Sequence, residues 1–300
     1  MLMVIVAMLV LPGIDAIAKW LSGSVSSGQI TWSRFFFQTL FMAPFALLAP
    51  RPWFGPMLKL HLARGALIAM ATLCFFSGLK YLPIADAIAI FFIEPLLVTL
   101  LSAVILGEAI HWRRITAITI GFIGALIVIR PAFDEVGPAA LFPIGAAIFF
   151  SCYIILTRKL AHHEHPAKMQ FLSGLSGALA MGVVLLVANI GSETIGQGDG
   201  GPMLGITWPS LYEWGLLAML GFIATVCHLL VVYAYQRAVV SILAPFQYVE
   251  IISATVLGLV FFNDFPDLVT WFGISIIIGS GIYVFHRESQ ISKSAQPDQA

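Results

Sequence analysis

Two glutamates lie in the middle of long apolar stretches, where ionisable side chains are rare and usually functional. Glu94 lies within residues 83–108, which are apolar almost throughout and long enough to cross a bilayer. Glu250 takes the equivalent place in residues 239–264, 156 positions further on (250 minus 94). A carboxylate at mid-membrane depth costs at least about 2.5 kcal/mol to insert, so each should face a cavity or a partner. The pair is predicted to bind a proton, or a cationic or hydrogen-bonding group of a solute. The alternative, equally open for Glu250, is a structural acid bonded to a neighbouring helix.

Aromatic and polar side chains accompany the two acids. Phe91 lies about one turn before the first acid and Phe246 four residues before the second, so both can share a helix face with them. These rings would give a small-molecule site an apolar wall. Gln247 and His228 are further polar residues within apolar runs of the second half. His228 is expected to be a hydrogen-bonded core residue unless it faces the second acid.

Prolines stand beside the same two acids. Pro95 follows Glu94 directly, and Pro245 precedes Glu250 by five residues. Proline lacks a backbone donor and obstructs the preceding turn, so the helix should kink beside the first acid. Both prolines are candidate points of flexing.

Four charged residues are predicted near the outer ends of their helices. Asp15 and Lys19 are four residues apart on one helix face and can pair, while Arg34 and Asp86 lie near the outer starts of later helices. The favoured interpretation is a structural clasp in which these charges neutralise one another. The alternative is that they line the mouth of a pathway.

Two short motifs suggest other chemistry. Residues 174–177 (GLSG) fit the GxSG pattern of intramembrane serine proteases, in which Ser176 would need a base such as His228. His162, His163 and His165 could form a metal tract, but a solvated loop is favoured. We therefore expect no enzyme activity, no metal and no cofactor.

The composition defines the class of protein. The chain has 300 residues, of which 60% are hydrophobic and 10% are charged, against about 25% charged in soluble domains. It is therefore predicted to be an all-α integral membrane protein that contacts lipid. The zero net charge argues against a nucleic-acid partner. Ten apolar runs are long enough to cross a membrane, at 2–21, 30–49, 62–81, 84–106, 113–130, 139–158, 168–189, 211–236, 239–262 and 268–286.

Basic residues predict the orientation, because cytoplasmic connections carry an excess of Lys and Arg. With the N-terminus inside, eleven basic residues, Arg64 among them, fall on the inner side and two, Lys80 and Arg130, on the outer side. Both termini are therefore expected in the cytoplasm, with residues 287–300 as a disordered tail. Five spans per half is an odd number, so 1–130 and 139–286 are predicted to be inverted repeats, an arrangement of many secondary transporters.

The chain resembles the EamA-type ten-span transporters of the drug/metabolite transporter superfamily. The resemblance rests on residues 78–108 (GLKYLPIADAIAIFFIEPLLVTLLSAVILGE), on the acids that close this run and its counterpart, Glu108 and Asp264, and on the Gly-rich helices at 118–131 and 271–284. It covers nearly the whole chain. In the second half Ile251 takes the place of the proline after the glutamate.

The resemblance implies alternating access around a central cavity between the two repeats. Members of the family move amino acids, nucleotide-related compounds, sugars, vitamins such as riboflavin, and S-adenosylmethionine. We therefore predict a secondary transporter of a small organic metabolite in the bacterial inner membrane, monomeric or homodimeric, with protons as a candidate coupling ion. The alternatives are the serine hydrolase and a membrane protein that transports nothing.

Overall fold

The computed structural model describes residues 2–48, 57–106, 112–161, 165–190, 203–235 and 249–294. These residues are almost entirely helical, with no strand among them. The α-helices, in chain order, are α1 (Leu2–Val10), α2 (Pro12–Leu21), α3 (Ser27–Leu47), α4 (Leu58–Leu79), α5 (Ile84–Phe91), α6 (Glu94–Leu106), α7 (Trp112–Val136), α8 (Phe142–Ala161), α9 (Pro166–Asn189), α10 (Leu211–Tyr235), α12 (Val249–Leu257) and α13 (Leu268–Ser294). A short 3-10 helix, η1 (Gly137–Leu141), precedes α8, and a π-helical segment, η3 (Gly258–Phe262), follows α12.

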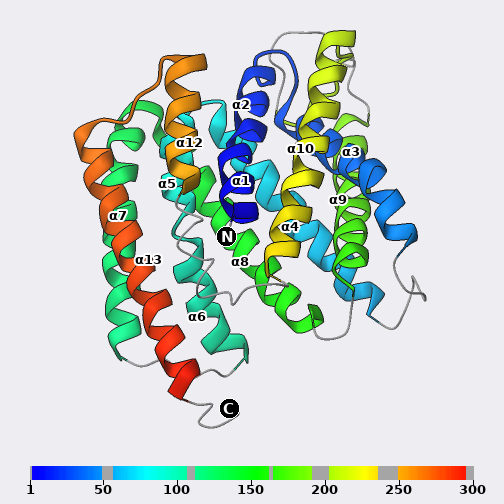
Figure 1. Cartoon of the computed structure of the whole chain (residues 1–300). Helices are drawn as coiled ribbons and strands as arrows, with labels where there is room; N and C mark the ends of the chain where they lie inside the picture. The colour runs from blue at the N-terminus through cyan, green and yellow to red at the C-terminus, as the bar shows by residue number, and fades with distance from the viewer. Residues whose placement is uncertain are drawn as a thin grey trace.

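The helices form one bundle with two distinct ends. At one end α7 packs along α13, and at the other α3, α4, α9 and α10 pack together (Figure 1). Helices α1, α2, α5 and α12 lie between these groups, and α8 contacts both α4 and α6. Residues far apart in the sequence are therefore brought together at the centre of the bundle.

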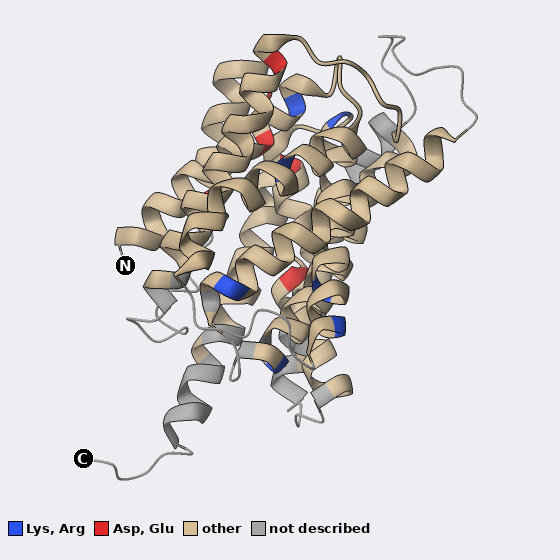
Figure 2. Ribbon diagram, turned by 90° about the vertical axis from the view of Figure 1, so that its right-hand side faces the viewer, with Lys and Arg blue, Asp and Glu red and all other residues tan. Residues whose placement is uncertain are grey.

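Six described stretches are long and apolar enough to cross a membrane. They are Leu2–Leu21, Leu58–Leu79, Ile84–Ile105, Gly137–Thr157, Ala167–Asn189 and Leu211–Val231. Shorter apolar helices lie at Thr119–Ile129, Val249–Phe262 and Leu268–Tyr283. Charged residues are few along the ribbon (Figure 2), and many large apolar side chains, such as Leu186 and Phe272, are exposed. This distribution is that of a multi-pass membrane protein, whose outer surface is solvated by lipid.

Two of the predicted continuous spans are interrupted. The first run is divided at Leu11 into α1 and α2, directly before Pro12. The run that carries Glu94 is divided into α5 and α6, with Phe92 and Ile93 in the turn between them. The predicted kink therefore lies immediately before Glu94 and Pro95, because proline cannot donate to the preceding turn.

The last helix is longer than the sequence analysis predicts. Helix α13 continues to Ser294, past residue 286, where the disordered tail is expected to begin. The polar residues here include Glu288 and Gln290, which favour helix, so the helix continues beyond its apolar part.

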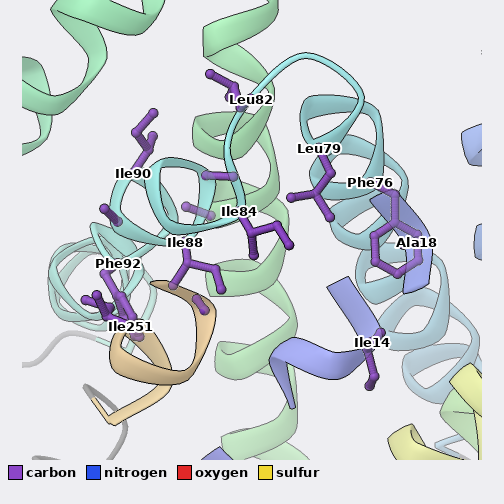
Figure 3. Close-up of a cluster of buried hydrophobic side chains, with 14 of the residues drawn as sticks. Ile14, Ala18, Phe76, Leu79, Leu82, Ile84, Ile88, Ile90, Phe92 and Ile251 are labelled. Atoms are coloured by element: carbon purple, nitrogen blue, oxygen red, sulfur yellow. The ribbon is translucent and has the colours of Figure 1, made fainter. Parts of the chain in front are cut away.

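The largest of three apolar clusters among the described residues lies at the centre of the bundle. Ile14 and Ala18 of α2 lie near Phe76 and Leu79 of α4, and Ile88 of α5 lies on the side towards α12 (Figure 3). Burial of each large aliphatic side chain contributes about 1.5–3 kcal/mol. The cluster therefore fixes α2, α4, α5 and α12, the elements that carry or adjoin the polar groups described next.

Candidate functional site

Four ionisable side chains from four helices are linked in a chain of electrostatic interactions, from Glu250 through Asp15 and Arg34 to His228. We call them the central cluster: Asp15 of α2, Arg34 of α3, His228 of α10 and Glu250 of α12. Asp15 and Arg34 are 8% and 9% exposed. Asp15 interacts electrostatically with both Arg34 and Glu250, and Arg34 also acts on His228. The cluster draws two residues from each half of the chain.

The Arg34 guanidinium is held at one end only. Its Nη1 donates to Thr72 Oγ1 of α4, and Thr72 in turn donates to the Ile68 carbonyl at 2.9 Å. The guanidinium lies over the ring of Phe35, 4.9 Å from its centroid. Its Nε is buried without a hydrogen-bond partner among the described residues. Among the described residues no direct ion pair joins Arg34 to Asp15. The Asp15 carboxylate therefore acts on the guanidinium through longer-range electrostatics.

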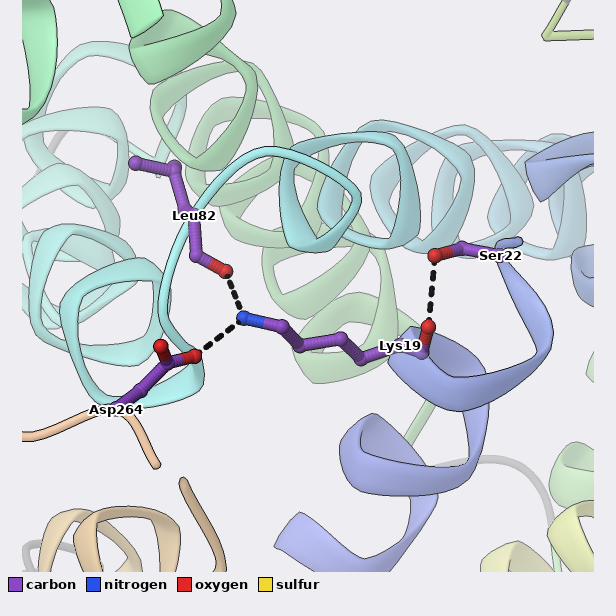
Figure 4. Close-up of polar contacts among 4 residues, drawn as sticks. All are labelled: Lys19, Ser22, Leu82 and Asp264. Atoms are coloured by element: carbon purple, nitrogen blue, oxygen red, sulfur yellow. Dashed lines mark hydrogen bonds and ion pairs between the residues drawn. The ribbon is translucent and has the colours of Figure 1, made fainter. Parts of the chain in front are cut away.

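Lys19 pairs with a residue from the other half of the chain. Its Nζ lies 2.7 Å from Asp264 Oδ2 and donates to the Leu82 carbonyl at 2.8 Å (Figure 4). It also lies 5.1 Å from the ring centroid of Phe262. Asp15, the expected partner of Lys19, interacts electrostatically with Arg34. The clasp of all four outer charges stays a prediction.

A tight turn places Asp264 beside Lys19. After η3, Asn263 adopts a φ of +57°, a left-handed conformation that asparagine tolerates better than most residues. The Asp264 N–H donates to the Gly258 carbonyl at 3.0 Å, which fixes the turn.

Both mid-span glutamates are partly buried. Glu94 lies in the first turn of α6, and Glu250 lies in α12. Ser151 of α8 donates to the backbone carbonyl of Glu94 at 3.3 Å. Helix α12 packs on α5, which ends just before Glu94.

An aromatic row lies close to Glu94 in the sequence and on the neighbouring helices. Phe91 stacks edge-on against Phe75 and Phe150, with centroids 5.5 and 5.4 Å away, and Phe150 contacts Tyr153. Asp86 lies in the first turn of α5. Pro245, Phe246, Gln247, Glu108, His162 and His163 lie outside the described residues.

The two residues of the hydrolase hypothesis both bond to helical carbonyls. Ser176 Oγ donates to Leu172 at 2.6 Å and contacts the His61 carbonyl at 3.2 Å. His228 Nδ1 lies 2.6 Å from the Ala224 carbonyl, its own helical turn. Ser176 is also pressed against Gly65, where an added Cβ would lie 1.7 Å from Oγ. A hydroxyl enclosed between two helices is poorly placed to attack a substrate.

Arg64 is a buried polar residue that the sequence did not reveal. It is counted among the inner-face cations, but it lies within α4 with an exposure of 2%, where that helix packs against α8 and α9. Its three nitrogens donate to Thr157 Oγ1 at 2.7 Å, the Met169 carbonyl at 2.8 Å and Tyr153 Oη at 3.1 Å. The signal available in the sequence is the glycine that follows it, because a small residue allows a close helix contact.

The chain also matches known proteins along most of its length. The model of the EamA-like transporter family matches residues 1–130 and 137–285. An S-adenosylmethionine uptake transporter of Rickettsia prowazekii (strain Madrid E) is 28% identical over 292 residues, which cover 95% of this chain and 92% of that protein. A riboflavin transporter of Brucella anthropi is 28% identical over 236 residues, 79% of each chain. A solved crystal structure shares the fold, with a TM-score of 0.63, 19% identity and 96% coverage of both chains.

The fold and these matches define the class of protein: a multi-pass membrane transporter of small metabolites. The chain belongs to the EamA-like transporter family.

Proposed function

We propose that this protein takes up S-adenosylmethionine, or a metabolite of the same charge pattern, across the bacterial inner membrane by alternating access. The observation that carries the proposal is the central cluster, in which the buried Arg34 guanidinium has an Nε without a partner among the described residues and Asp15, also buried, links it electrostatically to Glu250. S-adenosylmethionine has a sulfonium, an ammonium and a carboxylate, which match these groups in sign. The relatives named for its uptake, such as that of Rickettsia prowazekii, align with nearly the whole chain.

Two inverted five-helix halves, ten spans in all, would provide the moving parts. In support, the model of the EamA-like transporter family matches the chain twice, over residues 1–130 and 137–285. The helix contacts also occur in corresponding pairs. Helix α4 packs on α8 and α9, while α10 packs on α1, α2 and α3. Helices in equivalent positions, α3 with α9 and α7 with α13, contact each other directly. In secondary transporters with such repeats the solute binds between the two halves, and the halves rock around it.

Residues of both halves would then contribute to closing the pathway, binding the solute and moving the helices. The Lys19–Asp264 pair joins α2 to the turn after η3 and would hold one side closed. Asp15, Glu94 and Glu250 are the candidate groups for a cation or a coupling proton, since intramembrane acids have that role in many transporters. The breaks before Pro12 and Pro95 would allow the adjoining half-helices to tilt. The excess of inner-side Lys and Arg supports cytoplasmic termini.

The test is uptake of radiolabelled S-adenosylmethionine by liposomes that contain the purified protein. We expect saturable uptake that unlabelled S-adenosylmethionine abolishes and riboflavin does not. Asp15→Asn should reduce uptake at least about tenfold, because a desolvated charge partner is lost. Ser253→Ala, which removes an exposed hydroxyl that donates to the Leu9 carbonyl, serves as the control variant. Uptake of riboflavin alone, or of neither compound, would contradict the proposal.

A further inference from the structure

Three neighbouring side chains of α3 bury polar atoms that have no partner among the described residues. They are Ser33 Oγ, Arg34 Nε and Gln38 Oε1, and the exposures of Ser33 and Gln38 are 0% and 1%. Buried polar atoms in folded proteins almost always have hydrogen-bond partners, so exceptions need a reason. Arg34 and Gln38 are one turn apart and share a helix face. One is an unused donor and the other an unused acceptor.

The geometry of Arg34 indicates what its donor can take. Nη1 is occupied by Thr72, so the edge of the guanidinium that carries Nε is the one left for an acceptor. A guanidinium edge matches two oxygens of a carboxylate, or of a phosphate, in a bidentate geometry. Asp15 interacts electrostatically with Arg34, but no ion pair joins the two among the described residues.

The two acids of the cluster add a second constraint. Asp15 interacts electrostatically with both Arg34 and Glu250. A buried acid is unfavourable in its charged form unless a cation compensates it. A solute with two cationic groups would supply that compensation to Asp15 and Glu250, while its carboxylate would take the free edge of the Arg34 guanidinium.

We propose that Arg34 is the specificity-determining residue for the carboxylate of an amino-acid-like solute, with Gln38 accepting from the same solute and Asp15 and Glu250 facing its two cationic groups. This inference rests on the proposed function and specifies the site that performs it. The solute class it names is an amino acid that carries one extra cation in its side chain, as S-adenosylmethionine does in its sulfonium.

Three compounds that differ by one charged group test the assignment on the purified full-length protein. S-adenosylmethionine has both features, decarboxylated S-adenosylmethionine lacks the carboxylate, and S-adenosylhomocysteine lacks the sulfonium charge. Titration calorimetry gives the affinity for each. For the wild type we expect S-adenosylmethionine to bind at least about tenfold more tightly than either analogue, the usual value of a charge-assisted contact. Equal binding of S-adenosylmethionine and its decarboxylated analogue by the wild type overturns the inference without any variant.

Variants then assign each preference to a residue. In Arg34→Gln the preference over the decarboxylated analogue should disappear, while the preference over S-adenosylhomocysteine remains. In one of the two variants Asp15→Asn and Glu250→Gln, that of the acid that faces the sulfonium, the reverse should hold. Arg64→Lys alters the other buried arginine, whose nitrogens all bond within the protein, and should leave both ratios unchanged. Arg34→Lys, which keeps the charge but loses the planar edge, should give a reduced preference if Arg34→Gln does not fold.

The two proposals fail in different ways. If the wild type does not bind S-adenosylmethionine, the proposed function and the inference are both wrong. If the wild type binds it selectively but Arg34→Gln or Arg34→Lys keeps the wild-type ratio for the carboxylate, only the inference is wrong.

Discussion

Two buried arginines on neighbouring helices, Arg34 of α3 and Arg64 of α4, have contrasting surroundings. Each guanidinium lies over an aromatic ring, Phe35 or Tyr153, with the same 4.9 Å between guanidinium carbon and ring centroid. Every nitrogen of Arg64 donates to α8 or α9, whereas Arg34 has Thr72 as an acceptor and a buried Nε without one among the described residues. One carboxylate, that of Asp15, interacts with Arg34, while hydroxyls and a carbonyl surround Arg64.

The contrast shows how a structural ionisable group in a membrane differs from one that can act on a solute. The general expectation that an intramembrane charge is functional applies to both arginines and cannot separate them. The hydrogen-bond inventory does separate them. Every guanidinium nitrogen of Arg64 has a hydrogen-bond partner within the protein, and these bonds join three helices. Arg34 has a buried nitrogen without a partner among the described residues. A solute can add most where the protein has left donors and acceptors unused.

The largest expected effect is the loss of stability in Arg64→Gln. Its absence would contradict the contrast between the two arginines. Arg64→Gln removes the donors to three buried acceptors, each of which costs about 1–3 kcal/mol when left unsatisfied, so stability should fall by about 3 kcal/mol or more. Arg34→Gln should cost less, because its guanidinium is only partly bonded. Thermal unfolding of both purified variants, followed by circular dichroism, measures the difference. Similar midpoints for the two variants would show that the arginines have the same role.

The second prediction sharpens the comparison by testing the packing next to Arg64. At Gly65 an added Cβ would lie 1.7 Å from Ser176 Oγ and 3.0 Å from the Gly177 backbone nitrogen, so α4 and α9 must separate. Gly65→Ala should cost about 1–3 kcal/mol of stability through overpacking. The control is Gly215→Ala on α10, where no neighbouring atom lies within 4 Å, and which should be neutral or stabilising.

Ser176→Gly provides a further check on that prediction. It removes the hydroxymethyl group that the new Cβ would meet, so it should restore part of the stability lost in Gly65→Ala. The 3.0 Å contact with the Gly177 nitrogen remains, and rescue should be incomplete. Full stability of Gly65→Ala alone would mean that the two helices are less tightly packed than their contacts indicate.

The difference between the two arginines also marks where sequence reasoning stops. Hydropathy, helix-length runs and proline positions predict the helical membrane fold and the break before Glu94, because these depend on local composition. The partners of Lys19, Arg34 and Arg64 depend on which helices meet, and that is set by tertiary packing. Asp15 shares a helix face with Lys19, so a pair within the helix is the natural prediction, but the fold brings Asp264 to Lys19.

Lys19 is a third cation to compare with the two arginines, and its substitution should have the smallest effect on stability. Its Nζ bonds to Asp264 across the two halves, but both side chains keep some exposure, unlike those of the buried arginines. Partly exposed ion pairs contribute about 0–1 kcal/mol, because solvent screens them and the side chains lose freedom. Lys19→Met and Asp264→Asn should therefore each shift the unfolding midpoint slightly, and the double variant should resemble either single one. The double-mutant cycle isolates the pair, since each substitution removes the same contact. A coupling energy as large as the loss in Arg64→Gln would place Lys19 among the structural anchors, whereas a small one leaves the pair weak enough to open when the two halves move.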